Sequence, residues 1–251
     1  MTELAVLIGH GIGYSASPAM HNAAFAALDI DARYDLRDVP APALAGEINA
    51  LRGDGRIGAN VTAPHKLAAC HLVDEVGPEV RRLGATNTIL RYGDRLVARN
   101  TDLAALAAEL PTGVTRAVVL GSGGASRAAV TALRDAGCAQ LVVIDRARWA
   151  NLTGALTTVD LLINATPIGT ASDESPVPAR LLRADLRVLD LVYRPSPSRL
   201  VREARSSGAQ AHGGAGMLLR QAALSFTLWT GREAPLEAMR DALRAALGEV
   251  W

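Results

Sequence analysis

The stretch ANVTAPHK, residues 59–66, brings three different polar groups close together. Asn60 supplies an amide, Thr62 a hydroxyl and Lys66 an ammonium. Side chains alternate along a strand, so Asn60 and Thr62 are expected on one face of it. Pro64 cannot donate to a strand ladder and suits the first turn of a helix, so Lys66 is expected to emerge beside the strand end. The spacing predicts a polar site there, and a strand-to-helix loop with a solvated lysine is the alternative.

A second set of residues with recognisable chemistry is the glycine-rich turn GSGGAS, residues 121–126. The strand-like TRAVVL precedes it, a helical stretch follows, and the strand-like QLVVID closes the unit. In this context the turn predicts a dinucleotide site, because glycines let the backbone approach a pyrophosphate and the helix N-terminus attracts the anion. A bare turn without nucleotide is the alternative. The candidate residues are Gly121, Ser122, Gly123, Gly124 and Ala125.

Opposing charges at the end of the second strand of this unit bear on the choice of dinucleotide. Asp145 is placed to accept a hydrogen bond from a ribose 2′-hydroxyl, which favours NAD. Arg146 and Arg148 follow it, and guanidinium groups suit the 2′-phosphate of NADP. Pairing between Arg146 and Asp145 would neutralise both charges and leave little preference, and arginines that are only solvated loop charges remain an alternative.

Strand-like and helix-like stretches alternate along the first part of the chain and must position these groups. Three strand-then-helix pairs predict a mainly parallel sheet covered by helices. A Gly-Asp turn between apolar runs predicts a hairpin over 85–99, a helix is expected at 101–110, and the pattern restarts after Pro111, which predicts a domain boundary. The three pairs are 4–9 with 17–29, 32–40 with 42–53, and 57–63 with 64–76.

The composition limits the classes of protein to which the chain can belong. It has 251 residues, of which 49% are hydrophobic, which suits one large or two modest globular domains. The net charge of +1 argues against nucleic acid or an anionic membrane as a partner. The N-terminus does not resemble a signal peptide, and no apolar stretch reaches the length of a membrane span. We expect a cytoplasmic protein, and the sequence predicts no metal site.

Several ordered motifs together make the chain resemble the shikimate dehydrogenase family, almost from end to end. Four motifs are similar to the family's substrate site: YSASPAMHN (14–22), ANVTAPHK (59–66), GATNTI (84–89) and RNTD (99–102). Others are similar to its cofactor domain and its closing helix: GSGGASRA (121–128), NATPIG (164–169), DLVYRP (190–195) and GAGMLLRQAALSFTLWTG (214–231). The resemblance implies reversible reduction of 3-dehydroshikimate to shikimate by a nicotinamide cofactor, in aromatic amino-acid biosynthesis. NADP is the family default, and NAD remains possible because of Asp145.

The resemblance also implies roles for individual residues. Lys66 would face the oxygen that becomes negative when hydride reaches the ketone, and Asp102 would orient its ammonium. Ser15 and Ser17 would bind the substrate carboxylate, whereas His21 and His65 match no required role and are expected to be structural. Further substrate contacts would come from Asn60, Thr62, Asn87, Asp102, Tyr193 and Gln221. The cofactor site would add Asp145, Arg146, Thr166, Leu191 and Gly214 to the glycine-rich turn.

The expected fold is α/β with two domains. Residues 1–101 with 217–251 would form a substrate-binding domain, and 102–216 a Rossmann-like dinucleotide-binding domain whose second half, between Asp145 and Asn164, is shortened. The expected partner is a small molecule, shikimate or 3-dehydroshikimate, and the chain is expected to be a monomer or a homodimer. Two other functions remain open: an NAD-dependent dehydrogenase of quinate or an aminoshikimate-like compound, and a cofactor-poor binding or regulatory protein.

Overall fold

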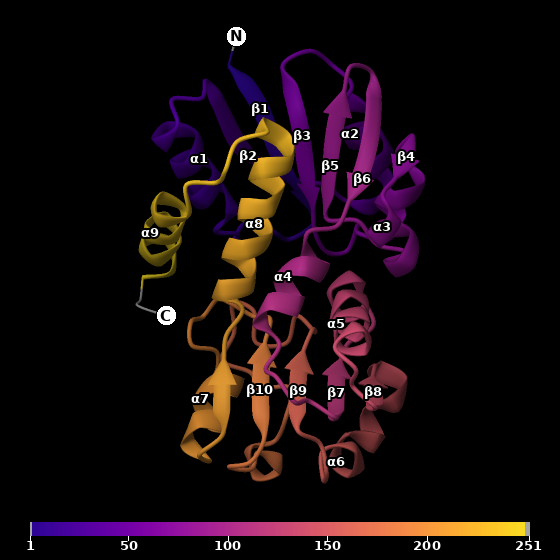
Figure 1. Cartoon of the computed structure of the whole chain (residues 1–251), viewed down its shortest axis with the longest axis vertical. Helices are drawn as coiled ribbons and strands as arrows, with labels where there is room; N and C mark the ends of the chain where they lie inside the picture. Colours follow the sequence, from indigo (N-terminus) through magenta and orange to yellow (C-terminus); the bar gives the residue numbers. More distant parts are fainter. Residues whose placement is uncertain (1, 249–251) are drawn as a thin grey trace. The chain divides into compact units, whose positions relative to one another are not determined.

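The computed structural model describes residues 2–248, and within them the chain forms two compact units. The first unit contains the chain up to Asp102 and again from Leu219, and the second contains Leu103–Leu218. Both units are α/β (Figure 1), which confirms the predicted fold class. No helix in the part of the chain that the structure describes is long and apolar enough to cross a lipid bilayer.

A mixed six-stranded sheet forms the centre of the first unit, in the order β2-β1-β3-β5-β6-β4. β1 pairs in parallel with β2 and β3, and β3 pairs antiparallel with β5. The predicted hairpin is confirmed, because β5 and β6 pair antiparallel across a turn in which Gly93 has a φ of +63°, a conformation that glycine adopts readily. The strands are β1 Glu3–Gly9, β2 Ala32–Asp38, β3 Arg56–Val61, β4 Glu75–Val76, β5 Thr88–Tyr92 and β6 Arg95–Arg99.

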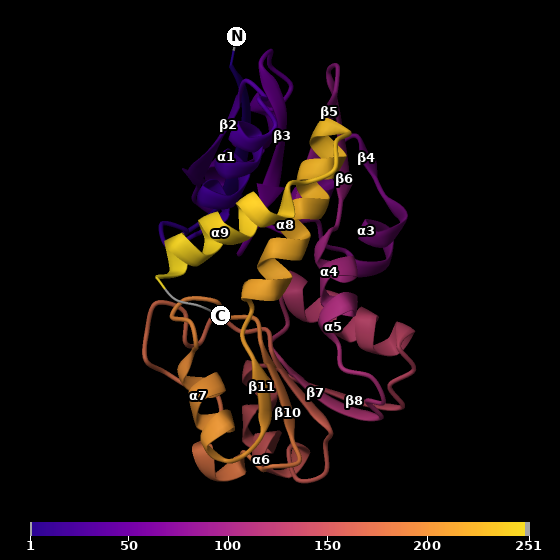
Figure 2. The same ribbon diagram turned by 60° about the vertical axis from the view of Figure 1, so that its left-hand side comes forward.

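The two faces of this sheet differ in chemistry. Val6 of β1 with Ala59 and Val61 of β3 joins helix α2 in an apolar cluster. Alternation along β3 turns Asn60 to the other face, where it contacts Ser225 of helix α8. Figures 1 and 2 show α8 lying along this face. The helices are α1 Ser17–Ala27, 3₁₀ helix η1 Ala41–Ala43, α2 Leu44–Ala50, α3 Pro78–Leu83, α8 Ala215–Thr230 and α9 Leu236–Leu247.

Helix α8 approaches the sheet closely at Gly58 of β3. A Cβ at this position would lie 2.2 Å from the carbonyl oxygen of Ile89 and 2.7 Å from Nε1 of Trp229. That indole nitrogen donates a hydrogen bond of 3.0 Å to the same carbonyl. The missing side chain therefore lets α8 pack directly on the sheet, which holds Gln221 and Ser225 of the same helix against it.

The helix predicted for residues 64–76 is wrong. After Pro64 the chain makes a turn, the 3₁₀ helix η2 (Ala68–His71) and then β4, which pairs with β6. The carbonyl oxygen of Lys66 shows why an α-helix does not form: it accepts the backbone N–H of Thr86 at 2.9 Å and the Sγ–H of Cys70 at 3.4 Å. A tertiary hydrogen bond thus replaces the helical one and anchors the backbone of Lys66.

A parallel five-stranded sheet, in the order β11-β10-β9-β7-β8, forms the centre of the second unit. The predicted strand–helix–strand unit is confirmed, and Gly137, with a φ of +82°, follows the end of its helix α5. Because the strands are parallel, the residues after β7, β9 and β10 meet at one edge of the sheet. The bounds are β7 Arg116–Leu120, α5 Gly124–Asp135, β8 Gln140–Ile144, β9 Leu161–Asn164, β10 Arg187–Asp190 and β11 Gln210–His212.

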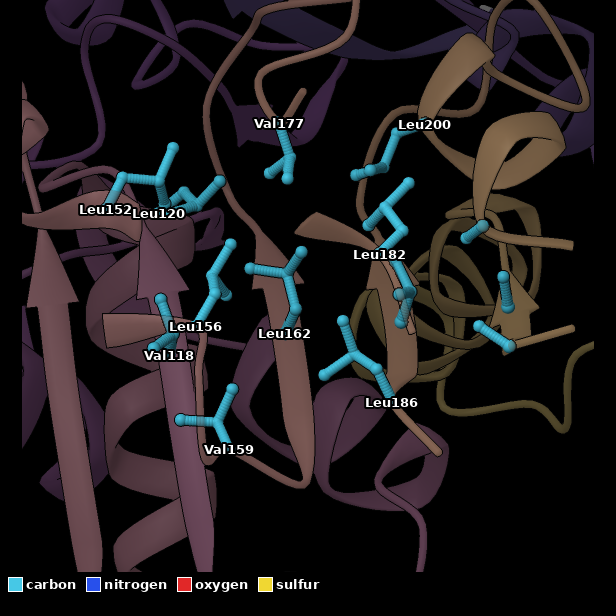
Figure 3. Close-up of a cluster of buried hydrophobic side chains, with 14 of the residues drawn as sticks. Val118, Leu120, Leu152, Leu156, Val159, Leu162, Val177, Leu182, Leu186 and Leu200 are labelled. Atoms are coloured by element: carbon cyan, nitrogen blue, oxygen red, sulfur yellow. The ribbon is translucent and has the colours of Figure 1, made fainter. Parts of the chain in front are cut away.

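The second half of this unit is shortened, as predicted. The residues between β8 and β9 form only the 3₁₀ helix η3 (Arg146–Asn151) and the helix α6 (Leu152–Ala155). Leu152 and Leu156 nevertheless belong to one buried cluster with Val118 and Leu162 of the sheet (Figure 3). The short segment therefore still covers the core. The remaining helices are α4 Asp102–Glu109, 3₁₀ helix η4 Ala179–Leu181 and α7 Arg199–Ser206.

Candidate active site

Lys66 and Asp102 form a tight ion pair in the first unit. Lys66 lies in the turn that follows β3, and Asp102 is the first residue of α4. Lys66 Nζ is 2.5 Å from Asp102 Oδ2, and the side chains are only 15% and 3% exposed. The other carboxylate oxygen, Oδ1, accepts a hydrogen bond of 2.8 Å from Asn87 Nδ2. Each oxygen of Asp102 thus has its own donor, which fixes the direction of the lysine.

The amide of Asn87 has a defined orientation. The backbone N–H of Thr101 donates to Asn87 Oδ1 at 2.8 Å. A backbone N–H can only donate, so this bond identifies Oδ1 as the oxygen and places the NH₂ group toward Asp102. The same NH₂ group lies 3.4 Å from Gln221 Oε1. The ammonium, the carboxylate and the two amides therefore form one buried polar cluster.

Lys66 is the only lysine of the 251 residues, against 25 arginines. Arginine keeps its proton in proteins, whereas a lysine can release one. The chain thus has its one lysine side chain at the position where the structure builds a largely buried ion pair. The spacing of the motifs does not reveal that Lys66 is the single lysine, whereas the composition does.

The other predicted substrate residues differ in their location and in their hydrogen-bond partners. Ser15 and Ser17 are adjacent at the start of α1, where the Ser15 hydroxyl donates to Ser17 Oγ at 3.2 Å. Thr62 directly follows β3 and is half-buried. Asn60 is turned to protein partners, because its Oδ1 accepts the Tyr34 hydroxyl at 2.8 Å and its Nδ2 donates to the carbonyl of Asn87 at 3.0 Å. These residues, with Asn87 and Gln221, belong to the first unit, whereas Tyr193 follows β10 in the second.

The predicted glycine-rich turn has the backbone geometry of an anion cradle. Gly121 follows β7 with a φ of +107°, and a Cβ there would lie 2.9 Å from the carbonyl oxygen of Ala165. Gly123 precedes α5 and has no side chain to cap it, which leaves the first N–H groups of the helix free of a local cap. Ser126 donates to the carbonyl of Gly121 at 2.7 Å, so this side chain also fixes the turn.

Polar residues at the ends of β9 and β10 support the same edge of the sheet. Asn164 Oδ1 accepts both the N–H (3.0 Å) and the hydroxyl (2.7 Å) of Thr166. Asn164 Nδ2 donates to Asp190, whose pKa burial raises to about 6 despite donors from Ser198 and Val192. The sequence prediction named Thr166 but missed Asn164 and Asp190, which are recognisable as polar residues that end buried strands.

Leu191, which follows β10, and Gly214, which follows β11, are in contact at this edge of the sheet. A Cβ on Gly214 would lie 2.3 Å from the carbonyl oxygen of Leu191, so only glycine allows this approach. The N–H of Gly214 donates to the carbonyl of Val192 at 3.1 Å. These close backbone contacts hold the segments that follow β10 and β11 against each other at this edge of the sheet.

Of the two arrangements that the sequence left open for Asp145 and Arg146, the ion pair is not formed. Instead, Asp145 caps η3, because its Oδ1 accepts the backbone N–H of Arg148 at 3.1 Å. Within residues 2–248, Asp145 makes no ion pair with either arginine. An Asp at this position satisfies a free N–H at the start of a helical turn, which competes with a surface ion pair of small energy. The carboxylate charge of Asp145 therefore remains uncompensated.

His21 and His65 have structural surroundings, as expected. His65 Nε2 lies 2.6 Å from the carbonyl oxygen of Val39. His21 is completely buried and stacked on Tyr34, with ring centroids 4.3 Å apart. Neither of its ring nitrogens has a hydrogen-bond partner among the described residues, and burial lowers its pKa to about 3.

This burial predicts a loss of stability in acid. The unfolded His21 binds a proton below a pH of about 6.5, whereas the folded one stays neutral down to a pH of about 3. The free energy of unfolding should therefore fall as the pH falls through this range. Replacing His21 by phenylalanine should remove about 2 kcal/mol of the loss between pH 7 and pH 5.

Urea unfolding of the wild type and of His21→Phe at both pH values measures the effect. The exposed His71 offers a control for the exchange of histidine for phenylalanine at a position in contact with water. Equal pH dependence in the wild type and His21→Phe would show that His21 is protonated in the folded protein.

Comparison with known proteins gives consistent matches over nearly the whole chain. Two family models match, described as shikimate dehydrogenase substrate binding domain (residues 7–89) and shikimate 5'-dehydrogenase C-terminal domain (residues 214–244). A protein of Symbiobacterium thermophilum named shikimate dehydrogenase (NADP(+)) is 40% identical, over 96% of this chain and 93% of its own length. One of Thermus thermophilus with the same name is 38% identical, over 99% of this chain and 100% of its own.

Solved structures agree with these matches. The shikimate 5-dehydrogenase of Thermus thermophilus, in complex with NADP(H) and shikimate, has a TM-score of 0.86 at 38% identity and covers 98% of this chain and 100% of its own. The quinate dehydrogenase of Corynebacterium glutamicum, in complex with NAD, has a TM-score of 0.85 at 26% identity and covers 97% of this chain and 99% of its own.

Proposed function

We propose that this chain, which belongs to the shikimate dehydrogenase family, catalyses the reversible reduction of 3-dehydroshikimate to shikimate with NADPH. The observation that carries the proposal is the buried pair of Lys66 and Asp102, held by Asn87. A binding protein without catalysis has no need for an ammonium held in this way. The relatives named as NADP(+) enzymes support the choice of cofactor.

The chemistry of the polar cluster fits this reaction. When bound, the nicotinamide supplies the hydride for the ketone carbon. Negative charge then develops on the ketone oxygen, and the Lys66 ammonium provides the positive charge and the proton that this oxygen needs. Asp102 Oδ2 holds the ammonium, and in the reverse direction the same pair accepts the proton from the hydroxyl.

The remaining site residues bind and orient. Ser15 and Ser17 present adjacent hydroxyls to the substrate carboxylate, with Tyr193 as a further contact. Thr62, Asn87 and Asp102 contact the ring hydroxyls, and Gln221 is a further substrate contact. Asn60 supports Asn87, because its amide is bonded to Tyr34 and to the carbonyl of Asn87. Residues 121–125 cradle the pyrophosphate, and Asp145, Arg146, Thr166, Leu191 and Gly214 border the rest of the dinucleotide. The first unit, up to Asp102 and again from Leu219, serves the substrate, and the second unit, Leu103–Leu218, carries the cofactor residues. The cytoplasmic location and the monomeric or homodimeric state stay predictions.

A spectrophotometric assay of the purified protein tests the proposal. Shikimate and quinate are each offered with NADP and with NAD, and reduction of the dinucleotide is followed. Efficient turnover of shikimate with NADP is the expected result. No turnover with any pair, together with no binding of NADPH in a fluorescence titration, would favour a cofactor-poor binding protein.

A second candidate is a quinate dehydrogenase that uses NAD. The uncompensated charge of Asp145 favours it, because a carboxylate near the ribose repels a 2′-phosphate. A higher kcat/KM for quinate than for shikimate in the same assay would establish this alternative. A similar preference for an aminoshikimate-like compound is tested by adding that substrate to the panel.

Asp145 should also weaken the discrimination between the two dinucleotides. Wild-type kcat/KM values for NADP and NAD should differ by less than about 100-fold, a gap below roughly 2.7 kcal/mol. Asp145→Asn should shift the ratio towards NADP, because the amide removes the charge while its oxygen can still cap the N–H of Arg148. Steady-state kinetics with both dinucleotides give the two ratios.

Asp145→Ala is the matched control, because it removes both the charge and the cap. It should shift the ratio in the same direction and lower the melting temperature, which Asp145→Asn should preserve. A wild-type preference for NADP of about 1,000-fold or more would mean that the carboxylate does not face the ribose.

A further inference from the structure

Three buried hydroxyl groups meet next to the amide of Asn87. They come from Thr88 of β5, Thr101 before α4 and Ser225 of α8, and each residue is 4% exposed or less. The Thr88 and Ser225 oxygens are 2.9 Å apart, those of Thr101 and Ser225 3.2 Å, and those of Thr88 and Thr101 3.4 Å. The proposed reaction gives none of these hydroxyls a task.

The protons of this hydroxyl cluster (Thr88, Thr101 and Ser225) can be assigned from partners that only donate or only accept. Ser225 donates to the carbonyl of Gln221 at 3.0 Å, since a carbonyl can only accept. Thr101 Oγ1 accepts from Asn87 Nδ2 at 2.8 Å, so its own proton is available for Ser225 Oγ. Thr88 donates to Asn87 Oδ1 at 3.0 Å. Each of the three hydroxyl protons thus has one acceptor, and the Thr88 and Ser225 oxygens, 2.9 Å apart, meet without a proton between them in this assignment.

The amide of Asn60 connects this cluster to the rest of the sheet. Its Nδ2 donates to Ser225 Oγ at 3.0 Å and to the carbonyl of Asn87 at 3.0 Å. Tyr34 holds Asn60 Oδ1 from the other side, which fixes the orientation of this amide as well. Ser225 thus joins α8 directly to the amide of Asn60, and it reaches the amide of Asn87 through the hydroxyls of Thr88 and Thr101.

We propose that Thr88 and Ser225 are positioning residues that hold the amide of Asn87 with its NH₂ group toward Asp102, and so aim the ammonium of Lys66. The inference rests on the proposed function for its kinetic consequence. Asn87 Oδ1 receives two donors, the N–H of Thr101 and the hydroxyl of Thr88. Turning the amide over would set its oxygen against the Asp102 carboxylate and its NH₂ group against the N–H of Thr101, and the Thr88 hydroxyl adds a second donor to the oxygen in the orientation that the structure has.

Two substitutions of Thr88 distinguish the effect of its hydroxyl group from the effect of its packing. Thr88→Val keeps the shape of the side chain and removes the hydroxyl, whereas Thr88→Ser keeps the hydroxyl and removes a buried methyl group. We expect kcat for shikimate oxidation to fall at least about tenfold in Thr88→Val, with KM changing less than about threefold. Thr88→Ser should recover most of the kcat although it loses packing. A merely structural role predicts that activity follows stability in the two variants.

Ser225 has a matched control on the same helix. Its hydroxyl donates to the carbonyl four residues earlier, and Thr230 makes the same type of bond to Phe226 at 2.9 Å. Ser225→Ala should lower kcat in the same sense as Thr88→Val. Thr230→Val also removes a hydroxyl from α8, but away from the cluster, and should leave kcat unchanged.

A spectroscopic measurement tests the positioning without requiring activity. Because the chain has one lysine, labelling with ¹⁵N,¹³C-lysine gives a single set of side-chain NMR signals, from Lys66. These signals should move or broaden in Thr88→Val and Ser225→Ala, and they should coincide with the wild type in Thr230→Val. Unchanged Lys66 signals in both cluster variants would overturn the inference, whether or not the protein turns over shikimate. An inactive wild type with signals that respond as expected would instead contradict the proposed function alone.

Discussion

Replacing Lys66 by alanine is expected to lower kcat for shikimate oxidation by about 10²–10⁴-fold, the usual cost of losing a positioned proton donor. The affinity for shikimate should stay within a few-fold of the wild type, because the ammonium serves the oxygen that changes charge in the reaction. Steady-state kinetics with NADP give kcat, and a fluorescence titration with shikimate gives the affinity.

Lys66→Arg separates the charge from the proton in this result. It keeps a positive side chain beside Asp102 but cannot readily release a proton. We expect it to remain far below the wild type in kcat. Near-normal turnover of Lys66→Ala would disprove the assignment of the catalytic group, whereas full activity of Lys66→Arg alone would show that only the charge matters.

Asp102→Ala is expected to lower kcat and to raise KM for shikimate together. Asp102 Oδ2 is paired with the ammonium of Lys66 and Oδ1 is bonded to Asn87, so its loss frees two groups that we propose to contact the substrate. Removing one partner of a buried ion pair also leaves the other charge unpaired, so a lower melting temperature should accompany the kinetic change. Kinetics and thermal unfolding of the same preparation measure both effects.

Asp102→Asn serves as the comparison, because it preserves the size of the side chain and removes only the charge. It should retain more of the substrate affinity than Asp102→Ala while remaining slow. If Asp102→Ala raised KM but left kcat intact, Asp102 would bind the substrate without orienting Lys66.

The sequence predicts best those parts of the fold that local signals define. The unit from Arg116 to Ile144 has a strand, a glycine turn, a helix ended by Gly137 and a second strand, and each part has its own local cause. The hairpin at Gly93 is of the same kind. Residues 64–76 differ, because the backbone N–H that binds the Lys66 carbonyl belongs to Thr86, which no local pattern around Lys66 reveals.

Only some residues of the site could be predicted, because only some of them lie in local sequence motifs. Lys66, Asn87 and Asp102 lie in recognisable motifs, and the structure brings them into contact. Ser225 could not be recognised, since a single serine in an apolar helix reads as an ordinary residue until β5 is packed against it. The sequence shows the negative charge of Asp145. It does not show that this carboxylate accepts the backbone N–H of Arg148, because that bond depends on the turn that follows.

The division of the chain has a consequence for the order in which the protein can be completed during synthesis. The polar cluster draws on residues 60–102 and on α8, and the whole second unit lies between them in the sequence. When the ribosome has made the first hundred residues, Ser225 is not yet available to form hydrogen bonds with Asn60 and Thr88. Trp229, which packs on Gly58, is also still missing. The second unit is continuous and can fold as soon as it emerges. Lys66, the proposed catalytic residue, is therefore synthesised early, but its surroundings are finished only when α8 has left the ribosome.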